Sequence, residues 1–237
     1  MASLPTCVAP RASGRELVPD LELDVVSAHA EPDTLIPILN FRIRINEREG
    51  HRVDAISLRC QIMVQATRRT YAPVEQEALL DLFGPPSRWG TTLKTMLWTH
   101  ASVDVAGFTG ATEAVVPVPC THDLTITAGK YFFALETGDV PLMFQFSGTI
   151  FWRDDDGSLQ VAPISWSKEA AFRLPVATWR ALMEAHDPDS AWLCLRRDTV
   201  EKLNRYKAHS GVPGWDAALS RLLEVAEEQA GPTGATA

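Results

Sequence analysis

The sequence predicts a mainly β protein: an antiparallel β-sandwich with a C-terminal helical segment, α+β overall. Three observations favour this fold class. Short runs of alternating apolar and polar residues recur from about residue 20 to 170, and turn residues separate them. The runs number about eight to ten, which suits two packed sheets. Beyond them the apolar spacing changes from two residues to three or four, which is typical of helices.

The domain organisation that we expect has four parts. Residues 1–19 and 231–237 are rich in small residues and proline and read as flexible tails. Residues 20–170 form the antiparallel sandwich, and residues 171–230 form the helical segment that packs on it. A chain of 237 residues can bury a sufficient core without disulfides or metal ions.

The first strands show the clearest alternation. In 40–46 the apolar residues share one face and Arg42 and Arg44 share the other, as in a half-buried antiparallel strand. Residues 56–66 repeat the pattern, and 47–51 form the turn between the two runs. These segments predict two consecutive strands, each with one face buried.

The next stretch breaks the alternation. Glu75 to Leu82 follows a proline and ends before Gly84, which predicts a short helix. Strands resume at about Thr91 to Val105. Prolines interrupt the apolar run 114–118, so we expect an edge strand or a bulge there.

Period-two spacing returns after residue 120. It predicts strands at 121–127 and 131–135, and the longest strand at 141–153. An Asp-Asp-Asp-Gly run at 154–157 predicts a tight hairpin. The return strand, 159–166, carries Leu159 and Val161 and shifts phase at a proline, which suggests a bulge.

The last part of the chain has helical spacing. Helices are predicted at 175–186, 199–208 and 215–229, the first of them beginning at a proline. Residues 192–195 are expected to be a short strand or a buried extended segment. The oligomeric state stays open, because an edge strand near Pro117 or the amphipathic final helix could mediate a dimer.

Several function classes lack their signatures. The dinucleotide and P-loop glycine motifs, the zinc-protease helix motif and the serine-hydrolase elbow do not occur. A net charge of −8 disfavours nucleic-acid binding. No apolar run reaches the roughly 20 residues that span a bilayer, and no signal peptide is recognisable. We therefore expect a cytoplasmic protein, more a binding protein than an enzyme, with no cofactor.

The densest set of potential metal ligands lies at Cys120, His122 and Asp123. Cys120 and His122 would share one face of the expected strand, but a closed zinc site needs about four ligands and no second pair has suitable spacing. We expect no metal site and retain Cys120 and His122 as weak candidates. The four cysteines form no CxxC motif; Cys60 and Cys194 lie among apolar neighbours and should be buried.

The seven tryptophans allow two interpretations. Trp89 and Trp98, with His100 nearby, could form a surface that binds a sugar or a partner. Alternatively, these tryptophans fill the core. Five others recur where the sheet should meet the helices and are expected to pack: Trp152, Trp166, Trp179, Trp192 and Trp215.

Four segments carry a family resemblance: 140–151, 172–179, 191–199 and 213–219. Together they resemble an uncharacterised actinobacterial family, a domain of unknown function whose genes often lie beside those of nickel–iron hydrogenases. The likeness covers most of residues 20–225. It implies an accessory role in hydrogenase assembly or regulation, and it supplies no catalytic residue.

Three hypotheses follow. The favoured one is a non-catalytic accessory protein whose partners are hydrogenase subunits or maturation factors. The second is a β-sandwich that binds a carbohydrate or another small molecule through Trp89, Trp98 and His100. The third is an enzyme with an unrecognised site around Cys120, His122 and Asp123.

Overall fold

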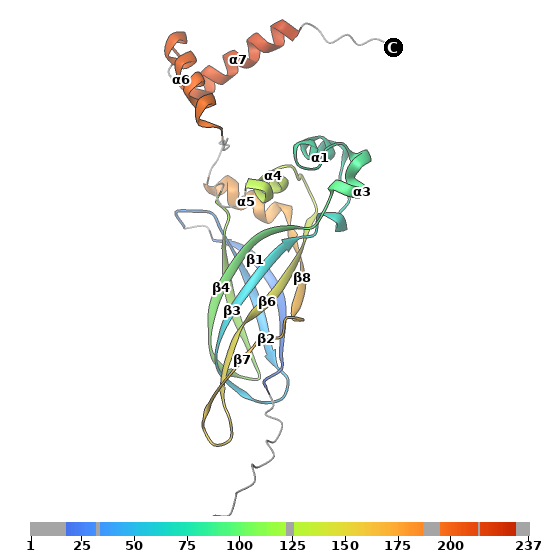
Figure 1. Cartoon of the computed structure of the whole chain (residues 1–237), viewed down its shortest axis with the longest axis vertical. Coiled ribbons are helices and arrows are strands. Elements are labelled where there is room, and N and C mark those ends of the chain that lie inside the picture. Colours follow the sequence, from blue (N-terminus) through green and yellow to red (C-terminus); the bar gives the residue numbers. More distant parts are fainter. Residues whose placement is uncertain (1–17, 32–33, 122–125, 187–194, 213, 231–237) are drawn as a thin grey trace, which may run out of the picture. The chain divides into compact units, whose positions relative to one another are not determined.

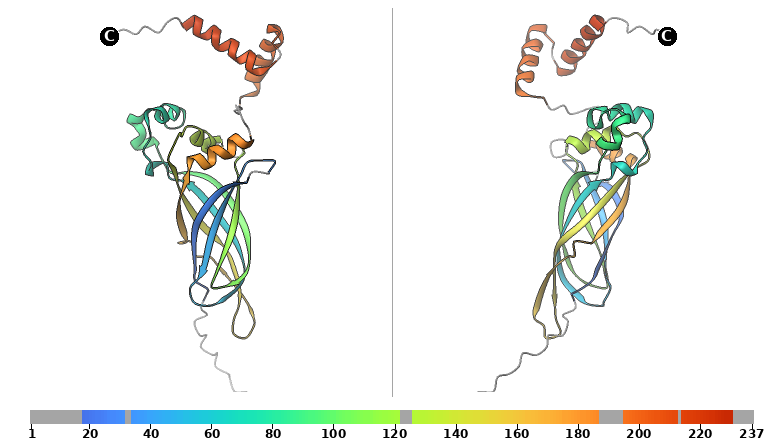
Figure 2. Two further views of the ribbon diagram at one scale, coloured as in Figure 1. Left: turned by 180° about the vertical axis from the view of Figure 1, so that it is seen from behind. Right: turned by 45° about the vertical axis from the view of Figure 1, so that its right-hand side comes forward.

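The chain forms two compact units, Met1–Ser190 and Ala191–Ala237. Figure 1 shows the computed structural model, and Figure 2 gives two further views. Each unit is described by itself. The structure describes residues 18–31, 34–121, 126–186, 195–212 and 214–230. The predicted tails therefore lie almost wholly outside the described residues.

The first unit contains a three-stranded antiparallel sheet, here called sheet A. Its strands are β1 (Leu21–Glu31), β2 (Ile38–Glu47) and β5 (Ala111–Pro119), in the order β1-β2-β5. Among the described strands, β5 pairs with β2 alone, so the prolines of the predicted edge strand do lie on a sheet edge.

Sheet B has five antiparallel strands, in the order β4-β3-β6-β7. They are β3 (Arg52–Val64), β4 (Met96–Thr109), β6 (Asp139–Arg153), β7 (Leu159–Pro163) and β8 (Glu169–Pro175). β8 pairs with the first half of β6 and β7 with its second half. β1 lies beside β8 and β4 beside β5, so the two sheets face each other across one core. The predicted mainly β, antiparallel fold is confirmed.

The positions of the core residues follow from the alternation of apolar and polar residues along the strands. Inward-facing side chains of β2, β3 and β6 are fully or almost fully buried, and they include Phe41, Ile43, Ile56, Leu58, Ile62, Phe144 and Phe146. The rings of Phe41 and Phe144 meet edge to face with centroids 5.1 Å apart, which joins the two sheets. Burial of these side chains is the main stabilising contribution to the sandwich.

The strand predicted at 131–135 is wrong. Residues Ile126–Phe133 form helix α4. Buried side chains at Ala128, Tyr131 and Phe132 are spaced by three residues and one, which is one helix face, whereas Phe133 is exposed. The predicted strand 121–127 lies mostly outside the described residues, and its last two residues belong to α4.

Short helices gather at one end of the strands in both figures. They are α1 (Pro73–Ala78), α2 (Leu80–Phe83), α3 (Trp89–Thr92), α4 and α5 (Val176–His186), with 3₁₀ turns at Ala66–Arg68 and Pro86–Arg88. The helix predicted at 75–82 is thus confirmed as α1 and α2. The strand expected from Thr91 begins only at Met96, because α3 occupies the preceding residues.

A buried ion pair fastens this helical end to the sandwich. Arg69 Nη2 lies 2.6 Å from Glu75 Oε1, and the two side chains are only 8% and 3% exposed. Arg69 also donates to the carbonyls of Asp139 and Thr137, at 2.8 and 2.6 Å. Glu75 Oε1 accepts the backbone N–H of Glu136 at 2.9 Å. α1 is therefore tied to the segment that leads into β6.

The second unit contains α6 (Arg197–Ser210) and α7 (Trp215–Ala230). Gly211 ends α6 in the left-handed region, with φ +64°. Both predicted helices are confirmed. The expected packing of these helices on the sandwich stays a prediction, and the extended segment predicted at 192–195 lies almost wholly outside the described residues.

Candidate functional site

The three residues singled out as a ligand surface lie in different environments. Trp98 is buried in the core, where its ring lies 4.9 Å from that of Phe132. His100 lies on the outer face of sheet B, where a ring nitrogen is 3.3 Å from Gln61 Oε1. Trp89 is half-buried among the helices. Burial of Trp98 removes the reason for expecting a sugar-stacking platform at this place.

The weak metal candidates are only partly described. Cys120 is buried, its thiol donates to the carbonyl of Val118 at 3.5 Å, and burial raises its pKa to about 12. His122 and Asp123 lie outside the described residues. Within the described ranges, three or more potential ligands nowhere converge. The Cys120 thiol is therefore a buried apolar group in this structure.

Sequence reasoning missed an exposed apolar surface at the edge of sheet B. Trp152 and Trp179 are buried as expected, but the packing predicted for Trp166 is wrong, because 93% of this residue is exposed. On the adjoining strand β7, Leu159 and Val161 are 55% and 56% exposed. We call Leu159, Val161, Pro163 and Trp166 the β7 surface.

The β7 surface is built by the pleat of an edge strand. Val161 pairs with Phe151 and Pro163 with Thr149, so the side chains at 159, 161 and 163 share the outer face of sheet B. Ile164 then turns inward and is buried. Trp166 projects from the loop that follows.

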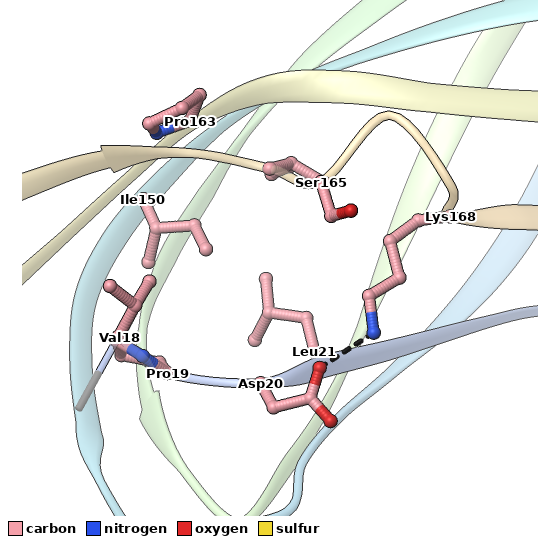
Figure 3. Close-up of a pocket in the computed structure, with 9 residues that line it drawn as sticks. Val18, Pro19, Asp20, Leu21, Ile150, Pro163, Ser165 and Lys168 are labelled. Carbon is pink, nitrogen blue, oxygen red and sulfur yellow. Dashed lines mark hydrogen bonds and ion pairs between the residues drawn. The ribbon is translucent and has the colours of Figure 1, made fainter.

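Hydrogen bonds fasten the loop on both sides of Trp166. Ser165 Oγ and Ser167 Oγ lie 2.9 Å apart, and Lys168 N donates to the Ser165 carbonyl at 3.1 Å. Lys168 Nζ bonds Asp20 Oδ1 at 2.6 Å, which ties the loop to the start of β1 (Figure 3). Because the turn is already ordered, a partner that contacts Trp166 has less conformational entropy to remove.

A cavity of about 230 Å³ lies beside this loop. Figure 3 shows that Ile150 and Leu21 line it, together with Ser165 and the Asp20–Lys168 pair. Sites for drug-sized ligands have volumes of about 300–1,000 Å³. The cavity is therefore suited to a single side chain or a small group.

Pro163 restricts backbone hydrogen bonding at the free edge of β7. Ile164 N donates to the Gly148 carbonyl of β6 at 2.9 Å. Alternate residues of an antiparallel strand face opposite edges, so Pro163 faces the free edge, where it offers no N–H. A short edge that carries a proline disfavours strand addition. The β7 surface thus offers side chains more than backbone for binding.

The outer face of sheet A differs in character. Glu113 pairs with Arg42 at 3.1 Å and with Arg44 at 3.2 Å, and Arg48 pairs with Glu22. Few apolar side chains are exposed on sheet A, and these ion pairs lie among them. Such a network is well hydrated, whereas the four side chains of the β7 surface carry no charge.

The family model described as "Family of unknown function (DUF6084)" matches residues 18–231. The chain belongs to this family. No curated protein matches it. The domain-of-unknown-function part of the resemblance is therefore confirmed, and the gene neighbourhood stays a prediction.

Two solved structures are similar to this DUF6084 chain. One is a crystal structure from Bordetella pertussis described as an ApaA protein: its TM-score is 0.25 and its identity 13%, over 66% of this chain and 93% of that one. The other is a solution structure described as a late embryogenesis abundant (LEA) protein: its TM-score is 0.29 and its identity 12%, over 67% of this chain and 73% of that one. At these scores neither structure supports an argument about function.

The β7 surface of this DUF6084 protein presents apolar and hydrogen-bonding side chains. The indole of Trp166 offers apolar area and one N–H donor. The neighbouring hydroxyls of Ser165 and Ser167 bond each other, not a general base. Among the described helices, none has the length and apolar character needed to cross a membrane.

Proposed function

We propose that this protein is a non-catalytic interaction protein that binds a protein partner through the β7 surface, with Trp166 as the anchor. The observation that carries the proposal is an indole that is 93% exposed on a loop held by hydrogen bonds on both sides. Tryptophan is enriched among the residues that dominate binding energies at protein interfaces. A fixed loop also lowers the entropic cost of binding.

The flanking charges specify the chemistry of the partner. The β6–β7 turn carries Asp154, Asp155 and Asp156 beside Leu159. The sequence as a whole has a net charge of −8. The partner that fits has an apolar hollow for the Trp166 ring, with lysine or arginine on the side that meets the turn.

The family resemblance of the sequence supplies the first partners to test. They are hydrogenase subunits and hydrogenase maturation factors, in the cytoplasm. This finer proposal rests on the resemblance, whereas the binding surface rests on Trp166 and β7. The two are separable, because another basic and apolar protein could occupy the same surface.

The experiment begins with affinity capture by the full chain, followed by reconstitution with the purified partner. Trp166→Ala is the test variant, and Trp166→Phe should retain part of the affinity because a ring remains. Leu80→Ala is the matched control, since Leu80 is exposed on α2 at the helical end. We expect reconstitution to fail for Trp166→Ala alone.

Two results would overturn the proposal at different levels. A partner that binds Trp166→Ala as tightly as the natural chain would show that the β7 surface is not the site. A deletion strain with normal hydrogenase activity, together with no binding to the purified subunits or factors, would remove the hydrogenase assignment. The second result would not test the β7 surface, which only the first result tests.

A further inference from the structure

The second unit, which contains α6 and α7 and is here called the helical unit, has almost no hydrophobic core of its own. In its described residues, 195–212 and 214–230, Ala218 alone is buried, at 1% exposure. Chains below about 40 residues rarely bury enough surface to fold without a disulfide, a metal ion or association. α6 and α7 therefore need another surface to pack against.

α7 presents an apolar stripe that its own hairpin does not cover. The stripe consists of Leu219, Leu222, Leu223 and Ala226, spaced by three, one and three residues on one side of the helix. Leu219 and Leu222 are half-buried, but Leu223 is 63% exposed. A leucine exposed to this degree beside other apolar residues marks an interface.

Charge is separated between the two helices. Residues 195–230 carry six basic and six acidic side chains, so this part is neutral and the rest of the chain carries the whole net charge of −8. Arg197, Lys202, Arg205 and Lys207 of α6 outnumber its two acidic residues. Asp216, Glu224, Glu227 and Glu228 of α7 outnumber its one arginine.

In the described part of this unit, no ion pair joins a cation to the acidic end of α7. The one ion pair among the described residues of this unit joins Arg196 and Asp198 at 3.4 Å, and Lys207 lies over the Trp215 ring at 4.8 Å. Glutamates in the last turns of a helix interact unfavourably with its dipole. A basic helix placed against this end would relieve that repulsion.

We infer that the helical unit binds the helical unit of a second copy of this chain, with the α7 stripes in contact and α6 of each copy facing α7 of the other. A neutral unit with separated charge is complementary to itself under two-fold symmetry. Two helical hairpins so joined form a four-helix arrangement with a shared core. The sandwich is a poorer occupant, because the unit that contains it carries net negative charge and repels the glutamate end.

The first test measures the oligomeric state of the full chain by sedimentation equilibrium. We expect a dimer whose dissociation constant rises at least about 30-fold in Leu223→Lys, because a charge replaces a central apolar contact. Ala217→Lys is the matched control, since it adds the same charge on the opposite side of α7. Unchanged helix content by circular dichroism would show that Leu223→Lys still folds.

The second test exchanges charges. One variant carries Lys202→Glu and Arg205→Glu, and the other carries Glu224→Lys and Glu227→Lys. Each variant alone should be a monomer, because α6 and α7 of that variant then carry net charge of the same sign. An equimolar mixture should recover a heterodimer, because every α6–α7 contact between the two chains is again opposite in charge.

Three outcomes would overturn the inference. They are a monomer at every concentration of the natural chain, a dimer that Leu223→Lys leaves unchanged, and a mixture of the two charge variants that stays monomeric. The first would also result if the helices fold back on their own sandwich. None of them bears on partner binding at the β7 surface, which is measured separately.

Discussion

Single residues decide how the helical end is held. The Arg69–Glu75 pair is buried and also bonded to backbone groups on two sides, unlike the exposed pairs of sheet A. Burial alone would raise the pKa of Glu75. The N–H groups of Glu136 and Ala72, together with Arg69, outweigh burial and leave the pKa lowered. Glu75 thus stabilises the fold in its ionised form.

Glu75→Gln should lower the free energy of unfolding by about 3 kcal/mol at pH 7, because it leaves Arg69 buried without its counter-charge. A lowered folded-state pKa means that the contribution is present above the unfolded pKa of about 4.5 and is lost as pH falls through the folded value. Urea denaturation from pH 3 to 7 measures this. Glu113→Gln, in an exposed pair, should cost less than about 1 kcal/mol, and an equal cost for both variants would contradict the account.

Two thiols should be inert. Burial raises the pKa of both Cys60 and Cys120 to about 12, so neither forms the reactive thiolate near neutral pH. In a Cys7→Ser/Cys194→Ser chain, Ellman's reagent at pH 8 should react at least about a hundredfold more slowly than with a free thiol. Denaturant should release two equivalents. Fast reaction of the folded chain would show that the core is open.

At the scale of elements, close approach of backbones fixes the pairing of β3 with β6. Gly148 lies opposite Leu58 with φ +134°, and a Cβ there would lie 2.0 Å from the Ser57 carbonyl oxygen. Gly157, at the β6–β7 turn, also has a positive φ, +84°, but a Cβ there would meet nothing within 4 Å. Substitution at these two positions therefore distinguishes the cost of a steric clash from the cost of backbone strain.

Gly148→Ala should therefore destabilise the protein by at least about 3 kcal/mol, and Gly157→Ala by about 1 kcal/mol. Chemical denaturation of the two variants beside the natural chain measures the difference. Equal costs would mean that β3 and β6 can separate slightly without loss of packing. That result would contradict the close pairing described here.

Elements with regular alternation were predictable, and irregular ones were not. β2, β3 and β6 follow from period-two spacing. β1 was missed because its register shifts between Val25 and Ser27, which interrupts the pattern. In α4 the run of Tyr131, Phe132 and Phe133 fits both the strand period and the helix period. Burial of Ala128 with Tyr131 and Phe132, while Phe133 is exposed, agrees with the helix.

At the scale of the whole molecule, the candidate site could not be predicted for a related reason. Leu159 and Val161 look like core residues in a sequence, because alternation does not tell which face of an edge strand is covered. The exposure of Trp166 depends on β7 ending at Pro163, and the sequence suggested instead that the strand continues. Trp98 follows the core interpretation instead, because its side chain faces the interior from β4 and is buried.

The most direct test of the central claim is the ratio of two dissociation constants, for Trp166→Ala and for the natural chain, measured with one purified partner. The β7 surface as the binding site predicts a ratio of at least about 30, equivalent to about 2 kcal/mol, with Leu80→Ala near one. A ratio near one for Trp166→Ala, with both proteins folded, would contradict it.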